Sequence, residues 1–243
     1  MELGSVTQLP PEKKALACKW VYKIKHKFDG SVEQFKAWLV ILDNRQKEGI
    51  DYTKTFAPIV KMVTVHTMLA VTALRAWELY QMDVHNAFLH EDLEEVVYMK
   101  PPPSFLPQQY DMVCKFNKSL YGLKQAPCCW FTKLSTTQKH YGFQQSLSDY
   151  SFFVLQRLEV HIVVLVYVDD LIISGDNHEA ITEFKAYLHN CFHMKDLGIL
   201  KYFLSVEVVR SSRDIFLCQR KYALDIIAEA GLWGAKISNV PIE

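Results

Sequence analysis

The sequence predicts an α+β fold, because segments with the patterns of strands and of helices interleave without a regular alternation. Half of the 243 residues are apolar, which is enough to bury a sizeable core. The rest of the chain is organised around Tyr-Val-Asp-Asp at residues 167–170. This stretch lies between two apolar runs, residues 160–166 and 171–173, and the order predicts a buried hairpin with two carboxylates at its bend.

Those carboxylates need compensation, because burying negative charge at the end of an apolar strand is costly. A divalent cation is the simplest partner. Adjacent Asp residues also occur in plain turns, where they accept local backbone hydrogen bonds. A second apolar segment, residues 78–83, ends in Asp83 and favours the metal interpretation. Two such strand ends side by side can hold two Mg²⁺ ions about 3.5–4 Å apart for in-line attack on phosphorus.

The composition argues against several classes of protein. The formal net charge is zero, a weak argument against a nucleic-acid partner, because phosphate binding usually shows as a basic excess. The six cysteines have no C-x-x-C spacing, so we expect neither a zinc site nor a disulfide framework. Residues 1–11 lack a signal-peptide pattern, and no apolar run approaches the ~20 residues of a membrane span. We expect a soluble intracellular protein without a transmembrane segment.

The first predicted element is a hairpin, in which residues 20–27 and 32–41 pair across a tight turn at Asp29-Gly30. A solvated strand face is enough to explain its positive charge. That charge comes from Lys19, Lys23, Lys25 and Lys27.

A helix at residues 64–77, with Thr64 as its cap, precedes the strand that ends in Asp83. Its apolar positions are Val65, Met68, Leu69, Thr72 and Ala76. The acidic stretch at residues 91–95 is expected to be a solvated loop, and residues 113–116 a short strand.

In the second half of the chain, residues 127–141 and 178–192 have the periodicity of helices, and residues 152–155 pair with 160–166. The remaining predicted elements are a strand at residues 201–209, a turn at 212–214, a strand at 215–217 and a helix at 222–230 that Gly231 ends.

Four motifs, in this order and spacing, resemble the reverse transcriptase of copia-type (Pseudoviridae) LTR retrotransposons. They are QMDVHNAFLH at residues 81–90, SLYGLKQAP at 119–127, YVDD at 167–170 and LKYFL at 200–204. The resemblance runs from about residue 16 to the last residue, and four motifs in register are highly specific.

The resemblance implies a right-hand polymerase fold with fingers, a palm built on an antiparallel sheet, and the start of a thumb. By the same resemblance, the positively charged N-terminal hairpin closes over the triphosphate of the nucleotide, and a hairpin at residues 203–208 is the primer grip. The chain would then divide into an N-terminal extension (1–15), fingers (16–76), the first catalytic palm strand (77–95), a fingers and connection segment (96–126), the palm (127–210) and the start of the thumb (211–243).

The activity implied by the resemblance is RNA-directed DNA synthesis, in which two metal ions assist the transfer of a dNTP onto a primer 3′-hydroxyl. The catalytic residues would be Asp83, Asp169 and Asp170, which would hold two Mg²⁺ ions, with Mn²⁺ as a substitute, together with the backbone carbonyl of Val84. The nucleotide would contact Lys36, Phe88, Tyr121 and Gly122. The primer and template would contact Tyr167, Val168, Phe203 and Leu204.

Two of these residues have specific expected roles. By resemblance, Phe88 stacks under the sugar and selects deoxynucleotides, although a plain core residue is the alternative. At Gly122, any side chain would collide with the substrate.

The partners implied by the resemblance are an RNA template, a DNA or tRNA primer and dNTPs, with no membrane. The chain would be a fragment of a Pol polyprotein, with integrase upstream and RNase H downstream, acting in cytoplasmic virus-like particles with a nuclear phase. The sequence leaves its oligomeric state open.

Several positions depart from the family pattern. Arg is usual where this chain has Trp38, His66 and Cys128, Gly is usual at Glu91 and Ser205, and residues 41–45 replace a small residue and Gly-Phe. The Arg and Gly replacements are all single C-to-T or G-to-A transitions in the genetic code, which suggests a decaying genomic copy. The alternatives are a catalytically inactive, polymerase-like module that binds nucleic acid or another partner, and a two-metal nuclease, which has no need of Phe88 or Gly122.

Overall fold

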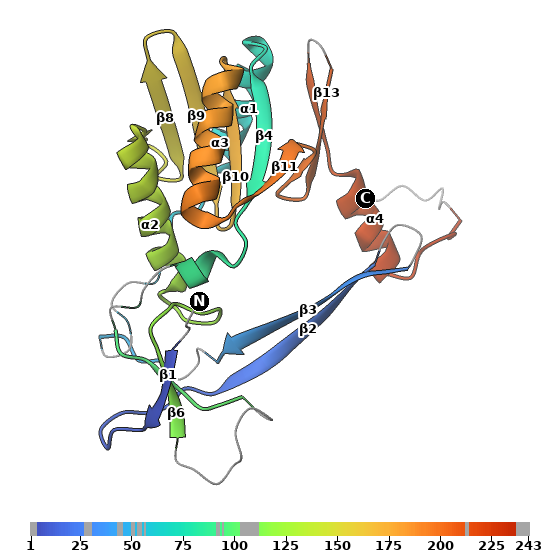
Figure 1. The fold of residues 1–243 in the computed structure, drawn as a ribbon. Helices are drawn as coiled ribbons and strands as arrows, with labels where there is room; N and C mark the ends of the chain where they lie inside the picture. The colour runs from blue at the N-terminus through green and yellow to red at the C-terminus, as the bar shows by residue number, and fades with distance from the viewer. Residues whose placement is uncertain are drawn as a thin grey trace.

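A six-stranded antiparallel sheet is the centre of the fold in the computed structural model. The structure describes residues 4–26, 31–42, 46–49, 52, 55, 57–90, 93, 95–102, 112–211 and 214–236. Helices α2 and α3 cover one face of the sheet and α1 lies behind the other (Figure 1). The predicted mixture of helices and antiparallel strands is confirmed.

The strand order of this sheet is β11-β4-β10-β9-β8-β7. Its strands are β4 (Glu78–Asp83), β7 (Gln144–Gln145), β8 (Phe152–Arg157), β9 (Val160–Tyr167), β10 (Asp170–Gly175) and β11 (Lys195–Ile199). The central strands β9 and β10 are buried on both faces, which explains why their sequences read as continuous apolar runs. The predicted hairpin at the Tyr-Val-Asp-Asp stretch is confirmed.

Side chains of β10 alternate between two hydrophobic cores, as strand geometry requires. Leu171 and Ile173 enter the core that α2 and α3 cover, whereas Ile172 enters the core beside α1. All three are at most 1% exposed, so the sheet is covered on both sides at this point.

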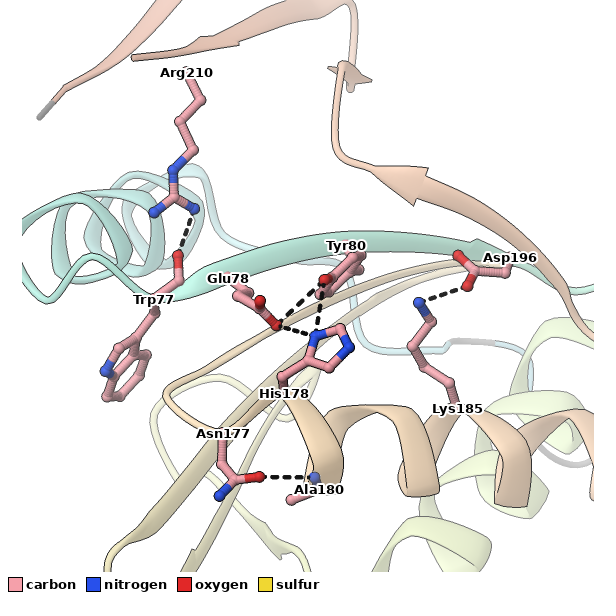
Figure 2. Close-up of polar contacts among 9 residues, drawn as sticks. All are labelled: Trp77, Glu78, Tyr80, Asn177, His178, Ala180, Lys185, Asp196 and Arg210. Carbon is pink, nitrogen blue, oxygen red and sulfur yellow. Dashed lines mark hydrogen bonds and ion pairs between the residues drawn. The ribbon is translucent and has the colours of Figure 1, made fainter. Parts of the chain in front are cut away.

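Helix α3 (His178–Phe192) is attached to strands β4 and β11 by polar contacts at its exposed edge (Figure 2). His178 Nδ1 lies 2.9 Å from Glu78 Oε2, which also accepts a hydrogen bond from the Tyr80 hydroxyl. Further along the helix, Lys185 Nζ lies 2.5 Å from Asp196 Oδ2 on β11. These contacts fix the helix over the strand that ends in Asp83.

Helix α2 (Ala126–Tyr141) and α1 (Met62–Leu74) agree broadly with the predicted helices, but the cap predicted for α1 is wrong. The helix begins two residues before Thr64, so this side chain lies inside the first turn. The Asp149 carboxylate takes the capping role, because it accepts hydrogen bonds from the Lys61 backbone N–H at 3.0 Å and from the Thr64 hydroxyl at 2.6 Å. Ala76 lies beyond the helix end.

Two further sheets come from the N-terminal half. The long hairpin of β2 (Cys18–His26) and β3 (Val32–Ile41) extends away from the central sheet (Figure 1). The described residues do not include its predicted turn at Asp29-Gly30 or Lys27. They also leave out most of the acidic stretch at residues 91–95, including Glu91. Strand β6 (Met112–Phe116) pairs with β5 (Tyr98–Met99) and with β1 (Gly4–Gln8), a strand that was not predicted from the sequence.

The last sheet consists of β12 (Tyr202–Phe203), β13 (Val206–Arg210) and β14 (Ile215–Cys218), followed by α4 (Arg220–Glu229). The continuous strand predicted at residues 201–209 is wrong, because a two-residue turn at Leu204 and Ser205 divides it. The hairpin that the resemblance implied at 203–208 is present. Arg210 donates a hydrogen bond to the Trp77 carbonyl and so joins this sheet to the start of β4 (Figure 2).

Within the described ranges, no helix combines the length and the apolar character needed to cross a bilayer.

The turn between β12 and β13 generates a stability prediction. Leu204 and Ser205 have φ values of 49° and 64°, and such two-residue turns favour Gly or Asn because L residues are strained there. We expect Ser205→Gly to stabilise the protein by about 0.5–1 kcal/mol in urea unfolding, since relief of strain exceeds the added entropy of the unfolded chain. Ser148→Gly, at an exposed bend outside the positive-φ region, is the control and should not stabilise. Equal effects of the two substitutions would contradict the explanation.

Candidate active site

Three acidic residues gather at one end of the central sheet. Asp83, the last residue of β4, is the register partner of Asp170, the first residue of β10. Asp170 is also paired with Tyr167, the last residue of β9, so Val168 and Asp169 form the two-residue turn between these strands. The pairing of β4 with β10 therefore brings together carboxylates that lie more than 80 positions apart in the sequence.

The acids lie on the sheet face opposite α2 and α3. Asp170 has the same strand parity as Ile172, which belongs to the core beside α1. Gln81 alternates onto this face together with Asp83, and its Nε2 donates a hydrogen bond to Asp170 Oδ1 at 3.0 Å. Gln81 was not predicted as a site residue, although its spacing of two from Asp83 was a usable signal.

The electrostatics of the cluster are unfavourable without a cation. Burial raises the pKa of Asp169, repulsion from Asp83 adds to the increase, and a backbone hydrogen bond and Lys36 oppose it. Burial also raises the pKa of Asp170, the hydrogen bond from Gln81 opposes this, and repulsion from Asp169 and Asp83 raises it further. The charged forms of Asp169 and Asp170 are therefore destabilised by burial and by the neighbouring carboxylates.

Hard oxygen donors with unneutralised charge fit a divalent cation such as Mg²⁺ or Mn²⁺. Among the residues that the structure describes, no three acidic, His or Cys side chains converge as a preformed metal cage. The chemistry of the donors thus fits a cation, while the side chains are not closed around one. Val84, the fourth expected ligand, is tied to the turn because its backbone N–H donates to the Asp169 carbonyl at 2.9 Å.

Two of the residues expected to contact the nucleotide pack against each other. The rings of Phe88 and Tyr121 lie 4.7 Å apart between centroids in an edge-to-face arrangement. Phe88 belongs to the main hydrophobic core, so a plain core role is enough to explain it. The sugar-stacking role stays a prediction. Burial raises the pKa of the Tyr121 hydroxyl, and Asp169 and Asp83 raise it further, which places this hydroxyl within the field of the acids.

Gly122 has a structural requirement that was not anticipated from the sequence. Its φ is +92°, and a Cβ atom there would lie 2.0 Å from the carbonyl oxygen of Ile41. The neighbouring Tyr121 carbonyl accepts a hydrogen bond from the Ile41 N–H at 2.9 Å. The end of β3 is thus in direct contact with the turn that contains Gly122, and this contact alone demands glycine.

Lys36 lies on β3 and interacts electrostatically with two of the acids, Asp83 and Asp169. Burial and the neighbouring Lys25 lower the pKa of its ammonium group, and Asp83 raises it. Its amino group also lies 5.6 Å from the centre of the Trp38 ring. Trp38, where the family pattern has Arg, therefore lies beside a lysine that interacts with both Asp83 and Asp169.

The residues expected to contact primer and template lie around the same hairpin end. The rings of Tyr167 and Phe203 meet edge to face at 6.0 Å, which joins the end of β9 to β12. Leu204 follows in the strained turn between β12 and β13, and the Val168 side chain is 43% exposed.

A pocket of about 280 Å³ lies beside Val168. It is lined by Thr55, Ala57, Pro58, Ile59, Pro127, Trp130, Phe131, Tyr167 and Val168.

Comparisons with known proteins identify the family of the chain. A family model described as "Reverse transcriptase (RNA-dependent DNA polymerase)" matches residues 2–243. The Retrovirus-related Pol polyprotein from transposon RE2 of Arabidopsis thaliana is 39% identical over 234 residues, which cover 96% of this chain and 16% of that protein. The corresponding polyprotein from transposon TNT 1-94 of Nicotiana tabacum is 39% identical over 241 residues, covering 98% of this chain and 18% of that protein.

A more distant relative is the Transposon Ty1-ER2 Gag-Pol polyprotein of Saccharomyces cerevisiae, 28% identical over 154 residues, which cover 56% of this chain and 8% of that protein. The chain therefore spans less than a fifth of the length of each of these three relatives.

The contact between Gly122 and Ile41 predicts a large loss of stability in Gly122→Ala. We expect a loss of about 2–5 kcal/mol in urea unfolding, because the added methyl group meets a backbone atom and the residue has a left-handed conformation. Gly49→Ala is the matched control, since Gly49 also has a positive φ but has no atom within 4 Å of the position that a methyl group would take. Similar losses in both variants would show that backbone conformation, and not the Ile41 contact, sets the requirement.

The raised pKa of Asp170 predicts a pH-dependent effect of Asp170→Asn. A folded-state pKa above the unfolded value means that the charged form destabilises the fold, and this cost develops as pH rises from about 3.9 through the folded pKa. In EDTA, the melting temperature of Asp170→Asn should exceed that of the native chain at pH 7, and the difference should vanish in acid. Asp225→Asn, on exposed α4, is the control. A pH-independent difference would rule out repulsion as its cause.

Proposed function

The chain belongs to the reverse transcriptase (RNA-dependent DNA polymerase) family and corresponds to the reverse transcriptase domain of retrotransposon Pol polyproteins, and we propose that its acid-bearing sheet end performs template-directed nucleotidyl transfer. The observation that carries the proposal is the pairing of Asp83 with Asp170, with Asp169 in the intervening turn. In this proposal the central sheet is the palm, the β2–β3 hairpin belongs to the fingers, and α4 begins the thumb.

The three carboxylates would hold two divalent cations. These ions, when bound, would lower the pKa of the primer 3′-hydroxyl and neutralise the charge of the triphosphate and the departing pyrophosphate. Asp83, Asp169 and Asp170 would hold the ions, with Gln81 orienting the Asp170 carboxylate through its hydrogen bond. The repulsion among these carboxylates supports the proposal, because it favours cation binding.

The neighbouring side chains would position the substrates. Lys36 would attract the triphosphate from the hairpin above the acids, and the packed rings of Phe88 and Tyr121 would form the wall against the sugar. Tyr167 and Phe203, which contact each other, would support the primer end. Base pairing with the RNA template would supply sequence specificity, so contacts to the backbone of an A-like hybrid would carry the affinity of the protein for a DNA or tRNA primer on its template.

A second candidate function is an inactive polymerase-like module that binds nucleic acid. Trp38 favours it, because an indole beside Lys36 cannot donate the bidentate hydrogen bonds that a guanidinium gives to phosphate. The strained Ser205 is a second cost at a position where the family pattern has Gly. Both replacements fit the hypothesis of a genomic copy that has decayed by C-to-T or G-to-A transitions, and changes outside CpG or CpNpG contexts in the coding DNA would count against that history.

Primer extension on an RNA template with Mg²⁺ tests the proposed activity. We expect slow extension by the native chain, none by Asp169→Asn, and a gain on the order of 10²–10³ in rate for Trp38→Arg, because a guanidinium stabilises charge that develops on the triphosphate.

The other outcomes separate the alternatives. Binding of the hybrid without extension in any variant would favour the inactive module. Degradation of the primer in the absence of dNTPs, abolished by Asp169→Asn, would instead indicate a nuclease.

A further inference from the structure

The turn between β9 and β10 has a backbone conformation that its own sequence opposes. Val168 has φ +54°, a left-handed conformation that is a genuine outlier for a β-branched residue. Two-residue hairpin turns that need a positive φ usually place Gly or Asn at this position. Contacts from outside the turn must therefore hold Val168 in place, and with it the peptide that leads into Asp169.

Two hydrogen bonds hold this turn from different elements. The Asp169 carbonyl accepts from the backbone N–H of Val84, immediately after β4, at 2.9 Å. The Val168 carbonyl accepts from the indole N–H of Trp130, one turn into α2, at 2.7 Å. Consecutive carbonyls of the turn are thus fixed by a strand and by a helix.

Trp130 is itself held rigidly. Its side chain is 1% exposed, and its ring packs edge to face against Phe192 at 5.1 Å and beside His90 at 5.9 Å. A donor held by packing in this way presents its N–H in one direction. The Val168 carbonyl lies in the peptide plane before the Asp169 Cα and the Asp169 carbonyl lies in the plane after it. Holding both carbonyls therefore sets the direction from which the Asp169 side chain leaves the backbone.

We propose that Trp130 is a positioning residue, whose indole N–H maintains the left-handed conformation of Val168 and thereby aims the Asp169 carboxylate at the cation site. The proposal deepens the proposed function and rests on it for the role of Asp169. It attributes the effect to the N–H group and not to the bulk of the ring, and this distinction makes it testable.

The test compares Trp130→Phe with Trp77→Phe in the full chain. Both substitutions remove an indole N–H and keep an aromatic ring, but Trp77 precedes the opposite end of β4. Amide hydrogen exchange of residues 81–86 and 165–172, measured without metal, reports the turn directly. We expect exchange of the Val84 amide to accelerate about tenfold or more in Trp130→Phe and to stay unchanged in Trp77→Phe.

Mn²⁺ titration, followed by the EPR signal of the free ion, measures the consequence for the carboxylates. We expect the dissociation constant to rise about tenfold in Trp130→Phe. Val168→Gly in the Trp130→Phe background should recover part of this loss, to about threefold, because glycine adopts a positive φ without strain. A purely structural role for Trp130 would give no such recovery.

The outcomes separate this inference from the proposed function. Unchanged turn exchange in Trp130→Phe, or unchanged Mn²⁺ affinity in a folded variant, would overturn the positioning role. If the native chain and Asp169→Asn bound Mn²⁺ equally, the proposed metal function would fail, and with it the role assigned to Asp169. The exchange contrast between the two Trp variants would then still decide whether Trp130 holds the turn.

Discussion

The pairing of β4 with β10 is the constraint on which the rest of the structure depends, because it sets Asp83 directly opposite Asp170. Like charges facing each other across a strand pair destabilise a sheet, and burial of the cluster adds to that cost. The strands can accept this arrangement only because their other residues are packed on both faces: Leu171 and Ile173 against the helices α2 and α3, and Ile172 against the α1 side. Stability gained along the length of the strands thus offsets the cost at their ends.

Long-range polar contacts keep this packing in one arrangement. The contacts of His178 with Glu78 and of Lys185 with Asp196 attach α3 to the strand that ends in Asp83 and to its neighbour (Figure 2). On the other face, burial raises the pKa of the Asp149 carboxyl, but hydrogen bonds from Ser151 and from the start of α1, at Thr64 and Lys61, outweigh burial and lower it. That contribution to stability is present above the ordinary carboxyl pKa and is lost as pH falls through the lowered value. At neutral pH, polar contacts therefore attach helices to both faces of the sheet.

The parts of the fold that sequence could predict are those with local signals. The apolar runs before and after the paired acids predicted the hairpin, and helical periodicity predicted α1, α2 and α3. Strands β1 and β11 were missed because their residues are mostly exposed and carry little alternation. The cap on α1 comes from Asp149, 85 positions after Thr64, and the demand for glycine at Gly122 comes from Ile41. Neither Asp149 nor Ile41 produces a signal in the sequence near the residue that it constrains.

The energetic cost of the acidic cluster bears on the choice between a polymerase and an inert module. Asp169 lies in a strained turn that Trp130 and Val84 hold, and repulsion among Asp83, Asp169 and Asp170 destabilises a fold that binds no cation. An inert module has no use for clustered carboxylates that destabilise its fold, whereas a cation-dependent enzyme requires them to bind its cation. The departures from the family pattern leave the three acids unchanged. Among the described residues they include Trp38 on β3, His66 on α1, Cys128 on α2 and Ser205 in the turn of the last sheet. Unchanged acids among altered neighbours favour the proposed polymerase over the inert module, with contacts to substrate as the part that has changed.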